Sequence, residues 1–389
     1  MTDNSRINVK HFGANGDGVT SDVDAINEAI REAGRTGLPV FIPSGDYVID
    51  KTITINNRVT IQGSGFTPYR DQNKNGTWFC LSKDGNYDRT WGVDVAIRTE
   101  SLTADGTVIR DLAITQEQEE PSNGEWLPNR PNLFAFFLAG RDLLLENIHL
   151  YNVTNGIRLE NVGNVTLNQI FGRPLRTGIQ ISYAADKVKI FNIHFWPYWE
   201  NSSNNVWDYM LKESVGILTE RNDNPHFNDV FMLGYGVGIR MQPSDPDRGR
   251  TTFYKIHNAE FDHCRTGIEI LGDNQHGQIS NLTGGATNPN NLSPTDSSGL
   301  LWLTGGGKLV QVSNLFGSHY PRNVIYAEGG STHLHISNAL IIEWDQANEG
   351  HAAIKAIEGA GVMITASQMN KYNEPRTRTE GDVRFASFT

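Results

Sequence analysis

The sequence has little cysteine and no long apolar run. Only Cys80 and Cys264 occur in 389 residues, so a disulfide framework is not required for folding. No stretch approaches the roughly 20 apolar residues of a membrane span, so no membrane partner is predicted. The first residues, MTDNSRINVKHFG, lack the apolar segment of a signal peptide. Two interpretations stay open: cytoplasmic synthesis with release by another route, or a leader that is missing from the sequence.

Basic residues are fewer than acidic ones: the sequence has 33 Lys and Arg and 44 Asp and Glu, which gives a formal net charge of −11. This balance argues against a nucleic-acid partner, although it is compatible with a locally basic groove. Metal-binding patterns are weak: His333 and His335 have no Cys or His cluster beside them, and Asp245-Pro-Asp247 is more typical of a solvated turn than of a calcium site. We therefore predict no cofactor and no metal, with calcium as the one cation that a motif faintly suggests.

What the sequence does have is a repeat. An Asn between short apolar segments recurs at intervals within the range of about 20–50 residues that is typical of stacked units. Its positions are Asn147, Asn168, Asn192, Asn228, Asn258, Asn281, Asn314 and Asn338. A second short strand headed by Gly follows most of them, as in GIRLE (156–160) and GIEI (267–270). Short segments of period two that are rich in Ile, Val and Phe indicate strands, so the repeat predicts a parallel β-solenoid.

The repeated Asn has a structural explanation. The apolar phase changes across it, which indicates a bend, and Asn tolerates the left-handed conformation that a bend requires. Stacked coils would then join these side chains into a ladder of amide hydrogen bonds. We interpret the repeated Asn residues as structural rather than catalytic.

The N-terminus is the most specific segment. Residues 7–34 predict a strand, a Gly-rich turn and a helix that is capped by Ser21 or Asp22. The apolar face of this helix comprises Ala25, Ile26, Ala29, Ile30 and Ala33. A solenoid has an open end that must be covered, and an amphipathic helix at this place would cover it.

Three motifs carry a resemblance to a known family: FGAxGDGxTxDxxAIxxAI, VFIPxGxY and IxGxG, all within residues 6–65. They resemble the N-terminal part of the pectate-lyase-like superfamily, in the branch of phage tailspike depolymerases and related bacterial polysaccharide-degrading proteins. The resemblance implies an all-β, single-stranded right-handed parallel β-helix, often a homotrimer, that acts on or binds polysaccharide. We expect a strand and capping helix in 1–38, about ten coils in 39–370 and a tail in 371–389.

The family is functionally mixed, so the fold is a weak guide to the reaction. The paired-Asp, Gly-His-Gly and Arg-x-Lys signature of polygalacturonases is absent, and 173–176 only approximates the RxPxxR of calcium-dependent pectate lyases. These two activities are therefore disfavoured.

Loop lengths are unequal around the repeat. The connection is long after Asp111, Asn192, Asn281 and Asn338, and short after the Asn residues between them. With coils about 4.8 Å apart, two short coils between long loops leave a trough roughly 10–15 Å wide at one corner. Loops on a rigid scaffold commonly carry function, so we expect a glycan chain to bind there. The alternative is that the loops line subunit contacts or are tolerated insertions.

Aromatic residues gather in the loop 195–213. Trp196, Trp199 and Trp207 offer faces on which sugar rings stack, and Asp208 lies among them. The alternative is a self-packed loop or a subunit interface.

Outward positions of the Gly-headed strands supply the catalytic candidates. Strand alternation places Arg158, Arg240 and Glu269 in one outward column, and Glu160 and Glu220 in the next. Glu160 and Glu220 would lie two coils apart, about 9–10 Å. This resembles the carboxyl separation of an inverting glycosidase, roughly 6.5–9.5 Å. We also interpret Leu301 and Leu303 as an outward apolar face that would support a trimer. The alternative for the Glu residues is a solvated surface.

Short corners carry Arg173, Arg176 and His263. Arg can bind sugar carboxylates through two hydrogen bonds, and in a lyase Arg or His can take the proton beside a uronate. The alternative is a corner residue that is satisfied by its neighbours.

These patterns favour an enzyme that cleaves a polysaccharide within the chain. A glycoside hydrolase using paired carboxylates from Glu220, Glu160, Asp208 and Glu269 is preferred over a lyase that acts by β-elimination on a uronate-containing glycan. A non-catalytic glycan-binding tail fibre is the alternative from another class. Fewer than ten residues precede the capping motif, which favours a stand-alone enzyme or a trimmed chain over a fibre. The expected place of action is extracellular or on a virion.

Overall fold

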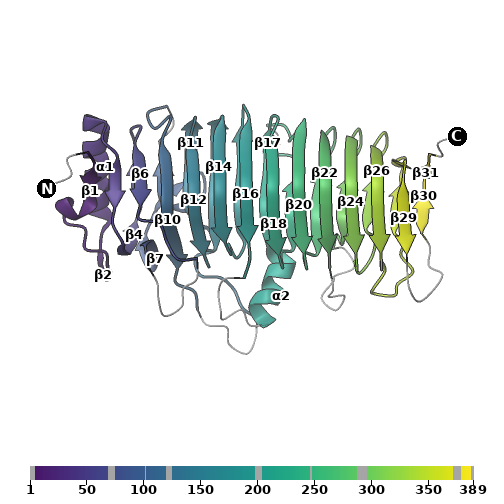
Figure 1. The fold of residues 1–389 in the computed structure, drawn as a ribbon, viewed down its shortest axis with the longest axis horizontal. Helices are drawn as coiled ribbons and strands as arrows, with labels where there is room; N and C mark the ends of the chain where they lie inside the picture. The colour runs from purple at the N-terminus through teal and green to yellow at the C-terminus, as the bar shows by residue number, and fades with distance from the viewer. Residues whose placement is uncertain are drawn as a thin grey trace. The chain divides into compact units, whose positions relative to one another are not determined.

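The computed structural model describes residues 5–68, 75–100, 102–119, 125–197, 204–245, 248–286, 296–370 and 378–386. The chain forms two compact units, residues 1–206 and 207–389. In each unit the strands alternate between two sheets, called sheet A and sheet B, and strands of successive coils pair in parallel (Figure 1). This is the parallel β-helix that the repeat predicted. Neither helix among the described residues has the length and hydropathy of a membrane span.

The first unit holds the capping elements and the early coils. It begins with β1 (Ile7–Asn8), the 3-10 helix η1 (Val9–Phe12), β2 (Asp17–Ser21) and α1 (Val23–Thr36). Sheet A continues with β3 (Val40–Ile42), β4 (Gly45–Lys51), β6 (Thr60–Gly63), β7 (Thr77–Asn86), β10 (Val108–Gln116), β12 (Leu144–Tyr151), β14 (Val165–Gly172) and β16 (Val188–Phe195). Sheet B comprises β5 (Ile53–Ile55), β8 (Asp88–Thr90), β9 (Val93–Thr99), β11 (Leu133–Arg141), β13 (Asn155–Gly163) and β15 (Thr177–Ala184). Only β8 is antiparallel among the strand pairs described in this unit.

The second unit repeats the alternation. Its sheet A comprises β18 (His226–Leu233), β20 (Tyr254–Asp262), β22 (His276–Gly285), β24 (Leu309–Ser318), β26 (His333–Ile342), β28 (Gly361–Ile364), β29 (Ser367–Asn370) and β31 (Val383–Phe385). Its sheet B comprises β17 (Val215–Asn222), β19 (Val237–Met241), β21 (Thr266–Leu271), β23 (Gly299–Thr304), β25 (Ile325–Glu328), β27 (Ile354–Ile357) and β30 (Thr379–Gly381). The helix α2 (Asn204–Glu213) lies across the boundary between the units in sequence.

Aliphatic side chains stacked in register form the core. In sheet B of the second unit the stack comprises Ile217, Ile239, Ile268, Leu301, Ile325 and Ile354, one residue from each successive strand. All six are fully buried. Burial of each side chain contributes about 1.5–3 kcal/mol, so a coil is stabilised by its contact with the next one.

The Asn ladder is present, with two corrections. Amide groups join Asn258, Asn281, Asn314 and Asn338 through hydrogen bonds of 2.8–2.9 Å, and each of these residues has a positive φ. In β14 and β18, however, the left-handed residue is not the expected Asn but the one after it, Gln169 or Asp229. Asn168 and Asn228 still join the ladder by accepting from Asn192 and Asn258.

The capping helix packs against β1, β3, β4 and β5. Four of its five predicted apolar residues are buried, Ala25 is half-buried, and Val23 is buried in addition. Asp22 is its N-cap residue, but its side chain does not bond the helix. The carboxylate instead accepts backbone N–H groups from Asn15 at 2.6 Å, Gly16 at 3.1 Å and Val48 at 3.1 Å. The Asp of the N-terminal motif therefore ties the Gly-rich turn to β4.

Three further expectations differ from the structure. Leu301 and Leu303 point into the core and are fully buried, so the apolar outward face that they were to form does not exist. Part of the expected loop 195–213 is the helix α2. Residues beyond 370 include β30 and β31, which extend sheets B and A.

Candidate functional site

The outer face of sheet B in the second unit carries a row of polar and aromatic side chains. Register places one outward residue per strand in this row: Leu218, Arg240, Glu269, Trp302, Tyr326 and Lys355. We call it the outer row. Two of the predicted site residues, Arg240 and Glu269, are neighbours in it.

Glu269 is held on two sides. Arg240 Nε donates to Glu269 Oε2 at 2.5 Å, and the hydroxyl of Ser297 donates to Oε1. Ser297 also contacts Thr266 Oγ1 at 3.0 Å. Glu269 is only 3% exposed, and the buried charge pair is oriented by these bonds. The carboxylate therefore has a fixed position just beneath the surface.

An aromatic pair stands next to Glu269 in the row. The rings of Trp302 and Tyr326 stack with centroids 3.9 Å apart and planes at 10°. Both side chains are half-buried. Burial, and then the hydrogen bond from the Tyr326 hydroxyl to Glu328, raises the pKa of Tyr326 above its usual range. Flat aromatic surfaces of this kind suit the apolar face of a sugar ring.

Glu220 lies on β17, on the same side of the sheet. The amide of Gln242 donates to its Oε1 at 3.4 Å. Glu220 is two strands away from Glu269, since β19 pairs with both β17 and β21. Glu220 also lies two residues farther along its strand than Leu218, the residue in register with Glu269, so the two backbones are about 12 Å apart. The paired carboxyl groups of inverting glycosidases are roughly 6.5–9.5 Å apart, which is shorter than this backbone separation.

The turn before β21 carries an exposed acid–imidazole pair. His263 Nδ1 lies 2.6 Å from Asp262 Oδ1, and both side chains are over 40% exposed. Arg265 pairs with Asp296 at 2.7 Å, and Asp296 directly precedes Ser297. A charged corner thus adjoins the outer row through residues 296 and 297.

Candidates of the first unit make internal contacts. Arg158 pairs with Glu160 along one strand at 3.1 Å, and Glu160 is 1% exposed. A register shift sets Glu160 opposite Tyr183 rather than Ser182, so its expected place in the outward column is wrong. Arg173 is buried at its corner, and Arg176 donates to the carbonyl of Pro131 at 3.0 Å.

The described aromatic candidates, Trp196 and Trp207, have different contacts. Trp196 stacks on His194 with ring centroids 6.1 Å apart. The ring of Trp207 packs on Gly234, where an added Cβ would lie 2.5 Å from it. Asp208 is exposed on α2. Trp199 and Asp247 lie outside the described residues.

Comparison with known proteins agrees with this architecture. Residues 6–125 match the model of the rhamnogalacturonase A/epimerase, pectate lyase-like family. An exopolygalacturonase structure from Thermotoga maritima aligns with 94% of this chain and 92% of its own, at a TM-score of 0.59 and 11% identity. The fold is thus a parallel β-helix similar to that of this solved structure.

Two curated relatives match only a short segment. Alginate lyase 7 of Azotobacter vinelandii is 44% identical over 66 residues, which is 15% of this chain and 8% of that protein. The pre-neck appendage protein of Bacillus phage B103 is 39% identical over 59 residues, 15% of this chain and 6% of that protein. The segment shared with these relatives is therefore a small part of each of them, and their activities are not carried over with it.

The candidate site includes residues that sequence reasoning missed. Trp302 was available from the alternation of GLLWL, had Leu301 and Leu303 been placed inside, and Tyr326 is in register with Trp302 on β25. Ser297 had no signal, because a loop brings its hydroxyl to Glu269 from a distant part of the sequence. No group of three His, Cys, Asp or Glu residues suited to a metal occurs in the part of the chain that the structure describes.

Proposed function

We propose that this chain is a carbohydrate-active enzyme that cleaves a polysaccharide within the chain, on the outer face of sheet B in the second unit. The observation that carries the proposal is a fixed carboxylate, Glu269, directly beside the stacked rings of Trp302 and Tyr326. The similarity to polysaccharide-acting proteins supports the substrate class. An open sheet face, unlike a closed pocket, accommodates the middle of a long glycan.

The favoured reaction is hydrolysis with inversion. Glu269, whose carboxylate is oriented by Arg240 and Ser297, acts as general base on a water molecule. The water oxygen attacks the anomeric carbon while its proton passes to Glu269. Glu220, which is more exposed, gives its proton to the leaving glycosidic oxygen. Arg240 and Ser297 position Glu269, and Trp302 and Tyr326 hold the neighbouring sugar by stacking.

The test uses Glu269→Gln and Glu220→Gln on a panel of neutral and uronate-containing polysaccharides. Each change keeps the shape but removes the acid–base group, so release of reducing ends should fall roughly 100-fold or more. Glu260→Gln, an exposed carboxylate on sheet A, is the matched control and should retain activity. Full activity of either site variant would refute the assignment. Products from wild-type protein should show the inverted anomer by NMR.

A second candidate is β-elimination on a uronate-containing glycan, favoured by the exposed Asp262–His263 pair beside Arg265. His263 would take the proton next to the uronate, and Arg265 would lie near its carboxylate. Absorbance of unsaturated uronates in the reaction mixture would support this reaction and exclude hydrolysis. Glycan binding without any cleavage would instead support a non-catalytic fibre.

The proposal extends to location and assembly. The phage appendage relative supports action outside the cell or on a virion. A homotrimer follows only from the resemblance, since Leu301 and Leu303 are buried within the chain. Light scattering on the purified protein would measure the oligomeric state directly.

A further inference from the structure

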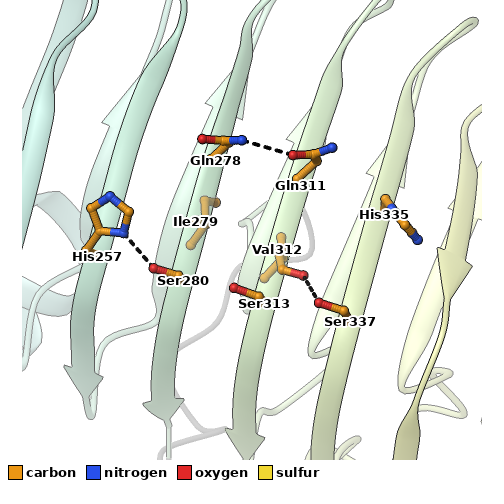
Figure 2. Close-up of a pocket in the computed structure, with 9 residues that line it drawn as sticks. All are labelled: His257, Gln278, Ile279, Ser280, Gln311, Val312, Ser313, His335 and Ser337. Atoms are coloured by element: carbon orange, nitrogen blue, oxygen red, sulfur yellow. Dashed lines mark hydrogen bonds between the residues drawn. The ribbon is translucent and has the colours of Figure 1, made fainter.

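A groove lies on the outer face of sheet A in the second unit, on the other sheet from the proposed catalytic site. It encloses about 420 Å³ and crosses β20, β22, β24 and β26. Figure 2 shows its lining, in which amide, hydroxyl and imidazole groups point outward from neighbouring strands. We call it the sheet A groove.

Strand register arranges the lining in two rows. Gln278, Gln311 and His335 form one row, one residue per strand. His257, Ser280 and Ser313 form the other row, two residues further along each strand. Hydrogen-bonding groups thus recur at the strand spacing of about 4.8 Å. A repeating polymer that runs across the strands would meet the same kind of group at each step.

The rows keep spare hydrogen-bonding capacity. Gln278 Nε2 donates to Gln311 Oε1 at 3.0 Å, which leaves the Gln278 carbonyl and the Gln311 amide NH₂ as acceptor and donor at the surface (Figure 2). His257 Nδ1 contacts Ser280 Oγ at 2.6 Å, so its Nε2 remains. Ser313 and His335 form no side-chain hydrogen bond within the described residues.

None of the groove's lining residues is Asp, Glu, Lys or Arg. A second cavity of about 420 Å³ shares Gln278 and Gln311 and adds an edge that includes Lys255, which is in register with Gln278. The apolar part of this edge is formed by Phe253, 59% exposed, and Leu309, 56% exposed. A polar, uncharged floor beside an apolar edge matches a sugar, which has hydroxyls around its ring and an apolar face.

We propose that the sheet A groove binds a neutral polysaccharide as a second, non-catalytic surface. A protein partner fits the groove less well, because the centre of a protein interface is enriched in apolar and aromatic side chains and this floor is built of amides and hydroxyls. The proposal stands apart from the catalytic one, since the two surfaces share no residue. Its effect would be to keep the enzyme on a long glycan between cleavage events.

The test compares wild-type protein with a double variant that carries both Gln311→Ala and Ser313→Ala. Binding is measured by affinity electrophoresis in three neutral polysaccharides: dextran, galactomannan and inulin. Polygalacturonate serves as the acidic comparison. Two hydrogen-bonding groups are lost, so the dissociation constant for the neutral polysaccharide that binds should rise about tenfold. Gln368→Ala removes an exposed amide of the same sheet outside the groove and should bind as wild type does. Ser313→Gln, which fills the groove, should weaken binding as the double variant does.

The binding measurements have outcomes that would overturn the proposal of a neutral-polysaccharide surface. Undiminished binding by both groove variants would overturn the proposal, and so would a wild-type protein that binds none of the three neutral polysaccharides. A groove variant that dissociates an oligomer without changing glycan affinity would show that the face is occupied by another copy. Glu269→Gln separates the two proposals: it should retain binding in the groove, whether or not it loses cleavage.

Discussion

A buried imidazole should make the protein sensitive to mild acid. His149 on β12 is fully buried among three rings. It stacks on Phe66 at 5.5 Å and meets Trp78 and Tyr151 edge-on or tilted, each at 5.9 Å between centroids. Burial lowers the pKa of His149 to about 3, against a weaker opposing hydrogen bond to the backbone of Pro68. Desolvation of the imidazolium is the physical cause.

The size of the effect follows from proton linkage. An unfolded histidine has a pKa near 6.5, so between about pH 6.5 and 3 the unfolded chain binds one proton more than the folded chain. Stability contributed by neutral His149 is thus fully present above about pH 6.5 and falls as the pH falls. Each pH unit in this window costs about 1.4 kcal/mol, so the loss at pH 4.5 is about 2–3 kcal/mol.

Urea unfolding at about pH 7 and pH 4.5 would measure this loss. His149→Phe keeps a flat ring between Phe66 and Trp78 but cannot take up a proton, so its loss of unfolding free energy on acidification should be about 2–3 kcal/mol smaller than that of wild type. Other titrating groups are common to both proteins and cancel in the comparison. His11→Phe replaces an exposed histidine of the same unit and should behave as wild type. Equal acid sensitivity of wild type and His149→Phe would refute the reasoning.

Two structural motifs give further predictions. Asn281→Ala removes hydrogen bonds to both neighbours of the ladder and the amide side chain that favours the left-handed conformation at φ 54°, which should cost about 2 kcal/mol of unfolding free energy. Asn281→Gly, which has no Cβ and tolerates that φ, should recover part of this loss. Asp22→Ala leaves three backbone N–H groups without their acceptor, from Asn15, Gly16 and Val48, and should cost about 3 kcal/mol or more, measured as a lower melting temperature than that of Asp22→Asn.

The Asn ladder shows how far sequence reasoning reaches. The residue that bends the strand lies two positions after an inward apolar residue, as Asn147 does after Leu145. In TLNQIF the inward residue is Leu167, so the bend falls at Gln169 and not at Asn168. The hydrophobic pattern therefore predicts the position of the bend more accurately than the position of the Asn does.

Other features were beyond the sequence. The register shift at Glu160 adjoins Asn161, which has φ 54° but does not belong to the repeated Asn positions, so the repeat did not indicate it. Ser297 reaches Glu269 from a loop whose path depends on the whole coil. Short-range patterns predict which residues face outward, but contacts between distant loops need the folded chain.

The two Arg–Glu pairs illustrate why the second unit carries the better candidate site. Arg158 and Glu160 lie two positions apart on one strand, so this ion pair joins two residues of the same strand. Arg240 and Glu269 join different strands, and a loop hydroxyl fixes the same carboxylate from the other side. Stability of the coils comes from the inward stack and does not require this arrangement. The Arg240–Glu269 pair, which Ser297 holds from a loop and which lies next to the stacked rings, is therefore better explained by binding of a ligand than by stability of the coils.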